Sequence, residues 1–185
     1  MTNAATTLEQ HRDDFSNRRF LAMPLAGAIM WALVGVAGVI APPFYKVMAV
    51  WVGAGSIFYL GMLLSRFTGE DFFGKHRAPN PFDRLFMSTV IMALLVFAIA
   101  MPFATVDHTS VPLCVGILTG LMWLPFGWII NHWVGAFHAI TRTVLIVGAW
   151  FALPDHRFVT IPFIVVAIYV VTIVALERRR YTKES

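Results

Sequence analysis

The side chains best suited to chemistry in this chain gather in one segment, residues 121–142. Polar groups interrupt an otherwise apolar sequence there, and they include two histidines and an arginine. An imidazole can act as a general base, and a guanidinium can hold a carboxylate or a phosphate through its planar fork. We therefore predict that the substrate-binding residues come from this segment and its helix breaker: Arg142, His138, His132, Asn131, Pro125 and Trp128.

Pro125 and Gly127 stand inside an apolar stretch that is long enough to be a helix. Proline removes one backbone hydrogen bond and clashes with the preceding turn, so the spacing predicts a kink or break near Leu121–Gly127. Backbone carbonyls freed at such a break can contact a ligand. The alternative is a kink that serves helix packing alone.

Arg142 is the one charged residue within the apolar segments. If a helix begins near Gly135, His138 and Arg142 share one face, and Arg142 lies roughly 6–10 Å inside the apolar layer. It could then extend to the membrane surface, or it could face the bundle and either pair with an acid or meet an anion. The candidate acids are Glu70, Asp71 and Glu177.

The sequence carries no pattern typical of a metal or cofactor site. His132 and His138 are six residues apart, whereas two metal ligands on one helix face are four apart. Cys114 is the single cysteine, which excludes an internal disulfide and a multi-cysteine metal cluster. No carboxylate lies within an apolar segment, and no nucleotide-binding signature is present. We therefore predict no metal and no cofactor.

These residues must be positioned by long apolar segments, each close to the roughly 20 residues that a helix needs to cross a bilayer. Backbone polar groups in lipid must be satisfied within the segment, so each segment is predicted to be a helix. We expect an all-α fold, a polytopic membrane bundle with six transmembrane helices: 20–41, 47–65, 85–104, 111–130, 137–153 and 159–176.

Composition and charge agree with this interpretation. Hydrophobic residues make up 58% of the chain and charged residues 13%, against about 25% charged in an ordinary soluble domain. We divide the chain into a polar N-terminal segment (1–19), the membrane domain (20–176) and a basic tail (177–185). The lipid bilayer is the expected partner, and the net charge of +4 is explained by topology and does not indicate nucleic acid binding.

The basic residues fall on one side of the six predicted spans. Lys46 and Arg157 alone belong to the other side. The positive-inside rule then places both termini in the cytoplasm, as in a multi-pass protein of a bacterial inner membrane. The residues on the basic side are Arg12, Arg18, Arg19, Arg66, Lys75, Arg77, Arg84, Arg178, Arg179, Arg180 and Lys183.

Gly116 and Gly120 are spaced as in a GxxxG motif. Small residues at this spacing let helix backbones approach closely in lipid. The motif therefore favours either packing within the bundle or a homo-oligomer formed through Gly116 and Gly120.

Two short motifs resemble an uncharacterised bacterial family of small multi-helix integral membrane proteins. They are Asp71–Phe73 and Leu124–Trp128. The resemblance covers most of residues 20–176 and implies the same architecture, but it brings no activity with it.

Three functions are compatible with these observations. The first is a small permease or transport-related protein, with a path past Pro125 to Arg142 for a small anion or an anionic headgroup. The second is a membrane enzyme that acts on a lipid headgroup, with His132 or His138 as general base. The third is a non-catalytic subunit that binds another membrane protein.

Overall fold

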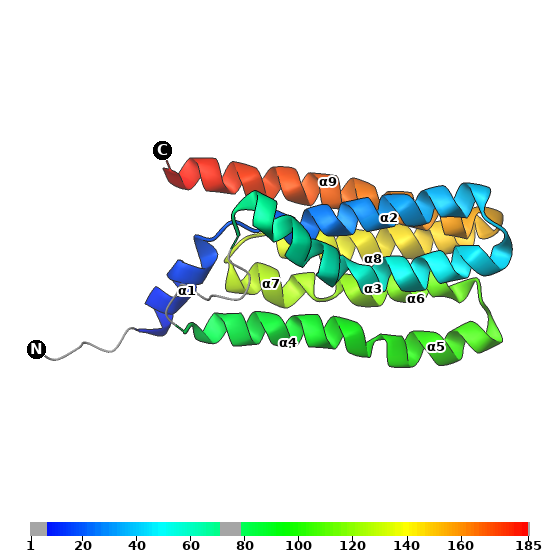
Figure 1. Ribbon diagram of the computed structural model, residues 1–185, viewed down its shortest axis with the longest axis horizontal. Helices are drawn as coiled ribbons and strands as arrows, with labels where there is room; N and C mark the ends of the chain where they lie inside the picture. Colours follow the sequence, from blue (N-terminus) through cyan, green and yellow to red (C-terminus); the bar gives the residue numbers. More distant parts are fainter. Residues whose placement is uncertain (1–6, 71–78, 185) are drawn as a thin grey trace, which may run out of the picture.

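The computed structural model describes residues 7–70 and 79–184, with side chains described as far as Tyr181. The described chain is a bundle of helices that run along one axis, and α1 and the end of α9 lie at the same end of it (Figure 1). The elements are α1 (Leu8–Ser16), α2 (Ala22–Ile40), α3 (Pro43–Thr68), α4 (Pro81–Leu95), α5 (Phe97–Val106), α6 (Ser110–Gly120), α7 (Trp123–Ile129), α8 (Val134–Ala152), the 3-10 helix η1 (Pro154–His156) and α9 (Arg157–Glu184).

Among the described residues, six helical stretches are long and apolar enough to cross a membrane. They overlap the six predicted segments and differ from them by a few residues at the ends, so the prediction of an all-α bundle with six helices long and apolar enough to span is confirmed. Two of the spans are built from pairs of helices, α4–α5 and α6–α7. The spans are Ala22–Ile40, Pro43–Thr68, Pro81–Val106, Ser110–Ile129, Val134–Ala152 and Pro154–Tyr181.

The surface of these spans carries large apolar side chains. Leu33 and Val39 of α2, Leu95 of α4 and Phe151 of α8 are all exposed. A water-soluble protein of this size rarely exposes so many large apolar side chains. Lipid is therefore the solvent that this surface fits.

The helices begin and end at residues that suit those positions. Pro43 opens α3 at a site that needs no backbone N–H, and Gly69 closes it with φ of 74°, in the left-handed region that glycine adopts without steric cost. Asn80 precedes α4 and its side chain accepts a hydrogen bond from the Phe82 backbone N–H.

The described part of the polar segment 1–19 contains a helix that packs on the bundle. Thr7 and Gln10 form a capping box that starts α1. Phe15 at its other end is buried, with its ring 6.4 Å from that of Phe82 and 6.1 Å from that of Phe86. These aromatic contacts hold α1 against α4.

The core lies where α2 packs against α3 and α9, its most extensive partners. Gly38 of α2 lies so close to α9 that an added Cβ would stand 2.0 Å from the Phe158 carbonyl oxygen. A glycine is required for this approach of two backbones. Fully buried core side chains include Trp31, Val50, Val111, Val115, Ile146, Ile161 and Val165. We call the end of the bundle that holds α1 and the last turns of α9 the basic end, because Arg18, Arg19, Arg179 and Arg180 gather there.

Candidate functional site

Arg142 lies in the middle of its span and not near the boundary. α8 begins at Val134, so Arg142 stands eight residues in, about 12 Å along the helix axis. Its side chain is 0% exposed. The alternative in which it extends to the membrane surface is therefore wrong. α8 begins at Val134, next to the expected start at Gly135, and the physical reason is the rotation of the helix, which turns this residue toward the core.

The guanidinium of Arg142 donates to two neutral groups. Its Nη1 lies 3.2 Å from Nε2 of His138, one turn earlier in α8, and its Nη2 lies 3.1 Å from Oγ1 of Thr119 in α6. The Thr119 hydroxyl donates in turn to the Val115 carbonyl at 2.6 Å. Thr119 is thereby held as an acceptor for Arg142.

His138 is fixed by a second chain of hydrogen bonds, which runs to α9. Its Nδ1 lies 2.8 Å from Oγ1 of Thr172, and the Thr172 hydroxyl donates to the Ile168 carbonyl at 2.8 Å. Because that hydroxyl proton is used, Nδ1 must carry the hydrogen and donate to Thr172. Nε2 is then the acceptor for Arg142, so the geometry fits a neutral imidazole.

Aromatic rings enclose the pair of side chains. Trp123 of α7 stacks on the His138 ring with a centroid distance of 4.2 Å. The Arg142 Cζ atom lies 5.4 Å from the centroid of Trp31 and 5.7 Å from that of Tyr169, within the range of cation–π attraction. These rings shield the charge from lipid.

Neither described candidate acid reaches Arg142. Glu70 accepts hydrogen bonds from the backbone N–H groups of Leu21 and Ala22 at the start of α2. Glu177 forms an ion pair with Arg19 at the basic end. Both acids make structural contacts with partners other than Arg142, because Arg142 lies deeper in the bundle than these residues at helix ends. Asp71, the third candidate acid, lies outside the described residues.

Arg142 therefore keeps a buried positive charge without a carboxylate among the described residues. Its Nε atom is buried and has no hydrogen-bond partner. Gly120, which follows Thr119 in α6, makes room for the side chain, since a Cβ there would stand 2.8 Å from Cδ of Arg142. Gly116 likewise faces the buried Ile146. Gly116 and Gly120 thus take part in packing within the monomer, which is one of the two roles expected from the sequence; the homo-oligomer stays a prediction.

The predicted break in the helix occurs beside this site. α6 ends at Gly120 and α7 begins at Trp123. Pro125 has no N–H for the Leu121 carbonyl, which accepts instead from Leu124 at 3.1 Å in a tighter turn. The prediction of interrupted hydrogen bonding at Leu121–Gly127 is confirmed, and Pro125 is its cause.

The other candidates lie at the turn between α7 and α8, toward the basic end. Asn131 has φ of 50°, and the bonds from Asn131 N–H to Trp128 and from His132 N–H to Gly127 close α7 in a Schellman motif. Asn131 thus has a local structural role. The structure brings His138 and Arg142 together but leaves Asn131, His132 and Trp128 outside their hydrogen-bond network.

Two arginines donate to carbonyls of this turn. Arg12 of α1 donates to the carbonyls of Trp128 and Ile129, and Arg179 of α9 donates to that of Ile130. Burial lowers the pKa of His132 below its usual value, and the positive charge of Arg179 lowers it further. α1 and α9 are therefore tied to the end of the broken span.

A pocket of about 90 Å³ reaches the site from the side of α3 and α4. Its wall includes Thr119, Trp123 and Tyr169, each of which touches Arg142 or His138. The rest of the wall is apolar. One layer of side chains thus separates this pocket from the buried charge.

Sequence reasoning missed the residues that complete the site. Thr119, Thr172 and Tyr169 stand on helices other than α8. The available signal was a hydroxyl well inside an apolar span, as at Thr119 and Thr172. In a membrane such a group needs a partner.

The matched family covers almost the whole of this architecture. The model of a family of unknown function (DUF7010) matches residues 8–179. The chain belongs to the DUF7010 family. The predicted resemblance to an uncharacterised family is confirmed to that extent, and the match includes α1 and most of α9. No curated protein and no solved structure matches this DUF7010 member.

Proposed function

We propose that this protein is a small transport-related membrane protein for a small anion or an anionic headgroup, with Arg142 as the charge that meets the anion. The observation that carries the proposal is the fully buried guanidinium at mid-span, which has neutral partners only among the described residues.

Burial of the Arg142 guanidinium carries a desolvation cost. Taking a guanidinium out of water costs several kcal/mol, and a carboxylate partner normally offsets that cost. Here His138 and Thr119 supply dipoles, and the Nε group of Arg142 stays unpaired. A bound anion would supply the missing negative charge and the missing acceptor.

The broken span supports transport over a purely structural role. Transporter sites commonly lie near the bilayer midplane beside discontinuous helices. In this protein Thr119 and Gly120, which contact Arg142, are the last residues of α6 before the break. A shift of α7 relative to α6 would move Trp123 off His138 and connect the lateral pocket with the guanidinium.

The enzyme alternative has less support. Both ring nitrogens of His138 are engaged in hydrogen bonds inside the bundle, so this imidazole is not placed to take a proton from a substrate at the surface. His132 lies at the basic end, and its Nδ1 accepts from the Val134 backbone N–H.

We place the protein in a bacterial inner membrane with the basic end in the cytoplasm. Arg19 and Arg179 gather at this end, and α4, whose first turn holds Arg84, begins there. α3 and α9, whose first turns hold Lys46 and Arg157, begin at the opposite end (Figure 1). The positive-inside rule supports this orientation. If an impermeant reagent labels a cysteine introduced at position 178 in intact cells, the orientation proposed here is wrong.

The test is anion flux in proteoliposomes that contain the full-length protein. Chloride, nitrate and inorganic phosphate serve as probes, with empty liposomes as the baseline. We expect flux of at least one probe with the parent and a loss of tenfold or more with Arg142→Gln, which keeps hydrogen-bonding capacity but removes the charge. Arg66→Gln, an exposed site on α3, is the charge-matched control and should retain the flux.

Two results would overturn the proposal. One is a folded parent protein that moves none of the three anions. The other is an Arg142→Gln protein that elutes as the parent does and transports at the parental rate.

A further inference from the structure

Two buried N–H donors inside the bundle have no acceptor among the residues that the structure describes. They are Nε of Arg142 in α8 and Nε1 of Trp31 in α2. Arg142 is 0% exposed and Trp31 is 1% exposed. A buried indole N–H usually finds a hydrogen-bond partner, and a buried donor without one is unfavourable. Both donors therefore need an acceptor that the described side chains do not supply.

The two side chains lie along the same face of α6. Gly120 faces Arg142, since a Cβ there would stand 3.0 Å from its Nε, and Gly116, one turn earlier, faces Trp31, with a Cβ 4.0 Å from its Cη2. The Cζ atom of Arg142 lies 5.4 Å from the centroid of the Trp31 ring. This separation lets one small acceptor contact both groups.

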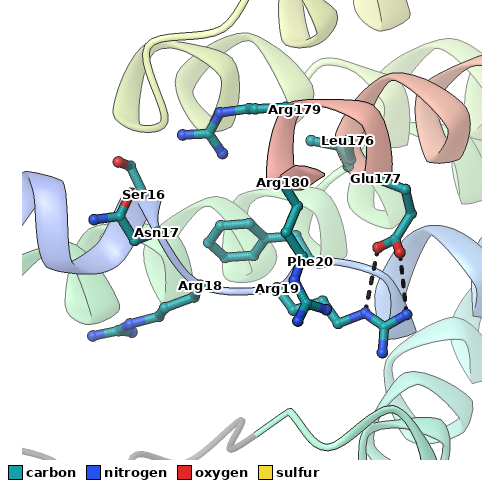
Figure 2. A pocket seen from close by; sticks show the side chains of 9 residues that line it. All are labelled: Ser16, Asn17, Arg18, Arg19, Phe20, Leu176, Glu177, Arg179 and Arg180. Carbon is teal, nitrogen blue, oxygen red and sulfur yellow. Dashed lines mark hydrogen bonds and ion pairs between the residues drawn. The ribbon is translucent and has the colours of Figure 1, made fainter. Parts of the chain in front are cut away.

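Arg19 at the basic end shows how this chain pairs an arginine with an acid. Its Nε and Nη2 donate to Glu177 at 3.3 Å and 3.2 Å (Figure 2). None of the described carboxylates forms such a pair with Arg142, whose other nitrogens lie against the neutral Thr119 and His138. The buried site thus combines one positive charge with a neutral indole donor.

We propose that Arg142 and Trp31 together bind a weakly hydrated monovalent inorganic anion, of the class that includes nitrate and bromide. The anion accepts from Nε of Arg142 and from Nε1 of Trp31, and so serves both buried donors. The inference rests on the proposed transport function, in which Arg142 meets the anion, and it narrows the class of substrate.

The charge of the site limits the charge of the anion. Arg142 is the one charged residue among the buried side chains that the structure describes, and the hydrogen bonds of His138 fit a neutral imidazole. A monovalent anion neutralises the guanidinium. A doubly charged anion such as sulfate would leave a net negative charge in a low-dielectric interior, which is unfavourable.

The walls beside the site favour an anion that gives up its water easily. The lateral pocket includes Thr119, Trp123 and Tyr169, and none of its lining residues is charged. An anion that enters from this side exchanges water for aromatic and aliphatic side chains before it reaches Arg142. This exchange is least unfavourable for an ion whose single charge is spread over a large radius.

The test measures anion binding by the full-length protein in detergent. Thermal unfolding is followed while sodium nitrate, bromide, sulfate or dimethyl phosphate replaces sodium gluconate at constant ionic strength, and Arg142→Gln provides the baseline for general salt effects. We expect a saturable rise in melting temperature with nitrate and bromide, and at least tenfold weaker binding of sulfate and of dimethyl phosphate, which mimics a lipid headgroup. Equal or tighter binding of either of these two, or no saturable rise with nitrate and bromide, would overturn the inference.

The deciding comparison is between two variants that remove an indole N–H and keep an aromatic ring. Trp31→Phe changes the site, and Trp133→Phe changes a side chain that is 59% exposed beside the start of α8. A hydrogen bond to a charged group is among the stronger ones, so we expect about tenfold weaker nitrate binding for the first variant and less than a twofold change for the second. Parental affinity in Trp31→Phe, the result expected if the indole N–H binds water instead, would overturn the inference.

Two further measurements complete the test. If Trp31→Phe fails to fold, anomalous scattering from parent crystals grown in bromide locates the ion, and a strongest site that is not within hydrogen-bond distance of Trp31 and Arg142 would overturn the inference. Nitrate flux in proteoliposomes separates the two proposals. Equal flux in the parent and in Trp31→Phe would overturn this inference alone, whereas a parent that binds nitrate through Trp31 but moves no anion would overturn the transport function alone.

Discussion

Replacing Gly120 by alanine tests the central claim about the buried site, namely that Arg142 is held in place against α6. The new Cβ would stand 2.8 Å from Cδ and 3.0 Å from Nε of Arg142. Carbon atoms in contact rest near ~3.5 Å, so the side chain must move by about 0.7 Å. The guanidinium cannot do so freely, because it is bound to Thr119 at 3.1 Å and to His138 at 3.2 Å.

The expected cost follows from three contributions. Overpacking costs about 1–3 kcal/mol, and loss of one hydrogen bond from a charged donor costs about 1.5–3 kcal/mol. The gain in helix propensity from glycine to alanine offsets about 1 kcal/mol. Gly120→Ala should therefore lower the free energy of unfolding by about 3 kcal/mol. Gly148→Ala is the control, because nothing lies within 4 Å of a Cβ at that position, and it should be neutral or slightly stabilising.

A double-mutant cycle assigns the cost to Arg142. In an Arg142→Ala background the clashing atoms are gone, so Gly120→Ala should cost little and the coupling should reach about 3 kcal/mol. Unfolding by SDS in mixed micelles, followed by tryptophan fluorescence, provides the free energies, since Trp31 and Trp123 lie at the site. The same penalty in both backgrounds, or no penalty in the parent, would refute the geometry.

Two further predictions concern the basic end and the helix core. The pKa of His132 is lowered in the folded protein, so the folded state disfavours the protonated imidazole. The contribution of His132 to stability should be fully present above the ordinary pKa of about 6.5 and decline as pH falls below it. In His132→Gln the melting temperature should therefore decline less between pH 7.5 and 5 than in the parent, and an equal decline would count against this reasoning. Gly38→Ala would put a Cβ 2.0 Å from the Phe158 carbonyl oxygen, so we expect a loss of about 3 kcal/mol from forced separation of two backbones. Gly55→Ala, which meets nothing within 4 Å, should leave the unfolding free energy near the parental value, and equal effects at both sites would contradict the packing.

The membrane architecture and the helix break were predicted from the sequence alone. An apolar run in lipid must satisfy its own backbone hydrogen bonds, so each run is a helix wherever its neighbours lie. The span predicted at 137–153 is observed at Val134–Ala152. The break before Trp123 was also predicted locally, because Pro125 deprives the Leu121 carbonyl of its helical donor. Pro162 stands inside the continuous α9, so a proline by itself does not decide that a helix breaks.

The surroundings of Arg142 were decided by tertiary structure. Thr119 and Tyr169 reach it from helices distant in sequence, while Glu70 and Glu177 bind elsewhere. In a soluble protein the polar face of each helix would reveal which side turns inward, but here both the core and the lipid accept apolar residues. The rotation of each helix about its own axis is therefore hardly encoded in its hydrophobic pattern. It is determined by close packing between helices, and that rotation decides which side chains meet the buried charge.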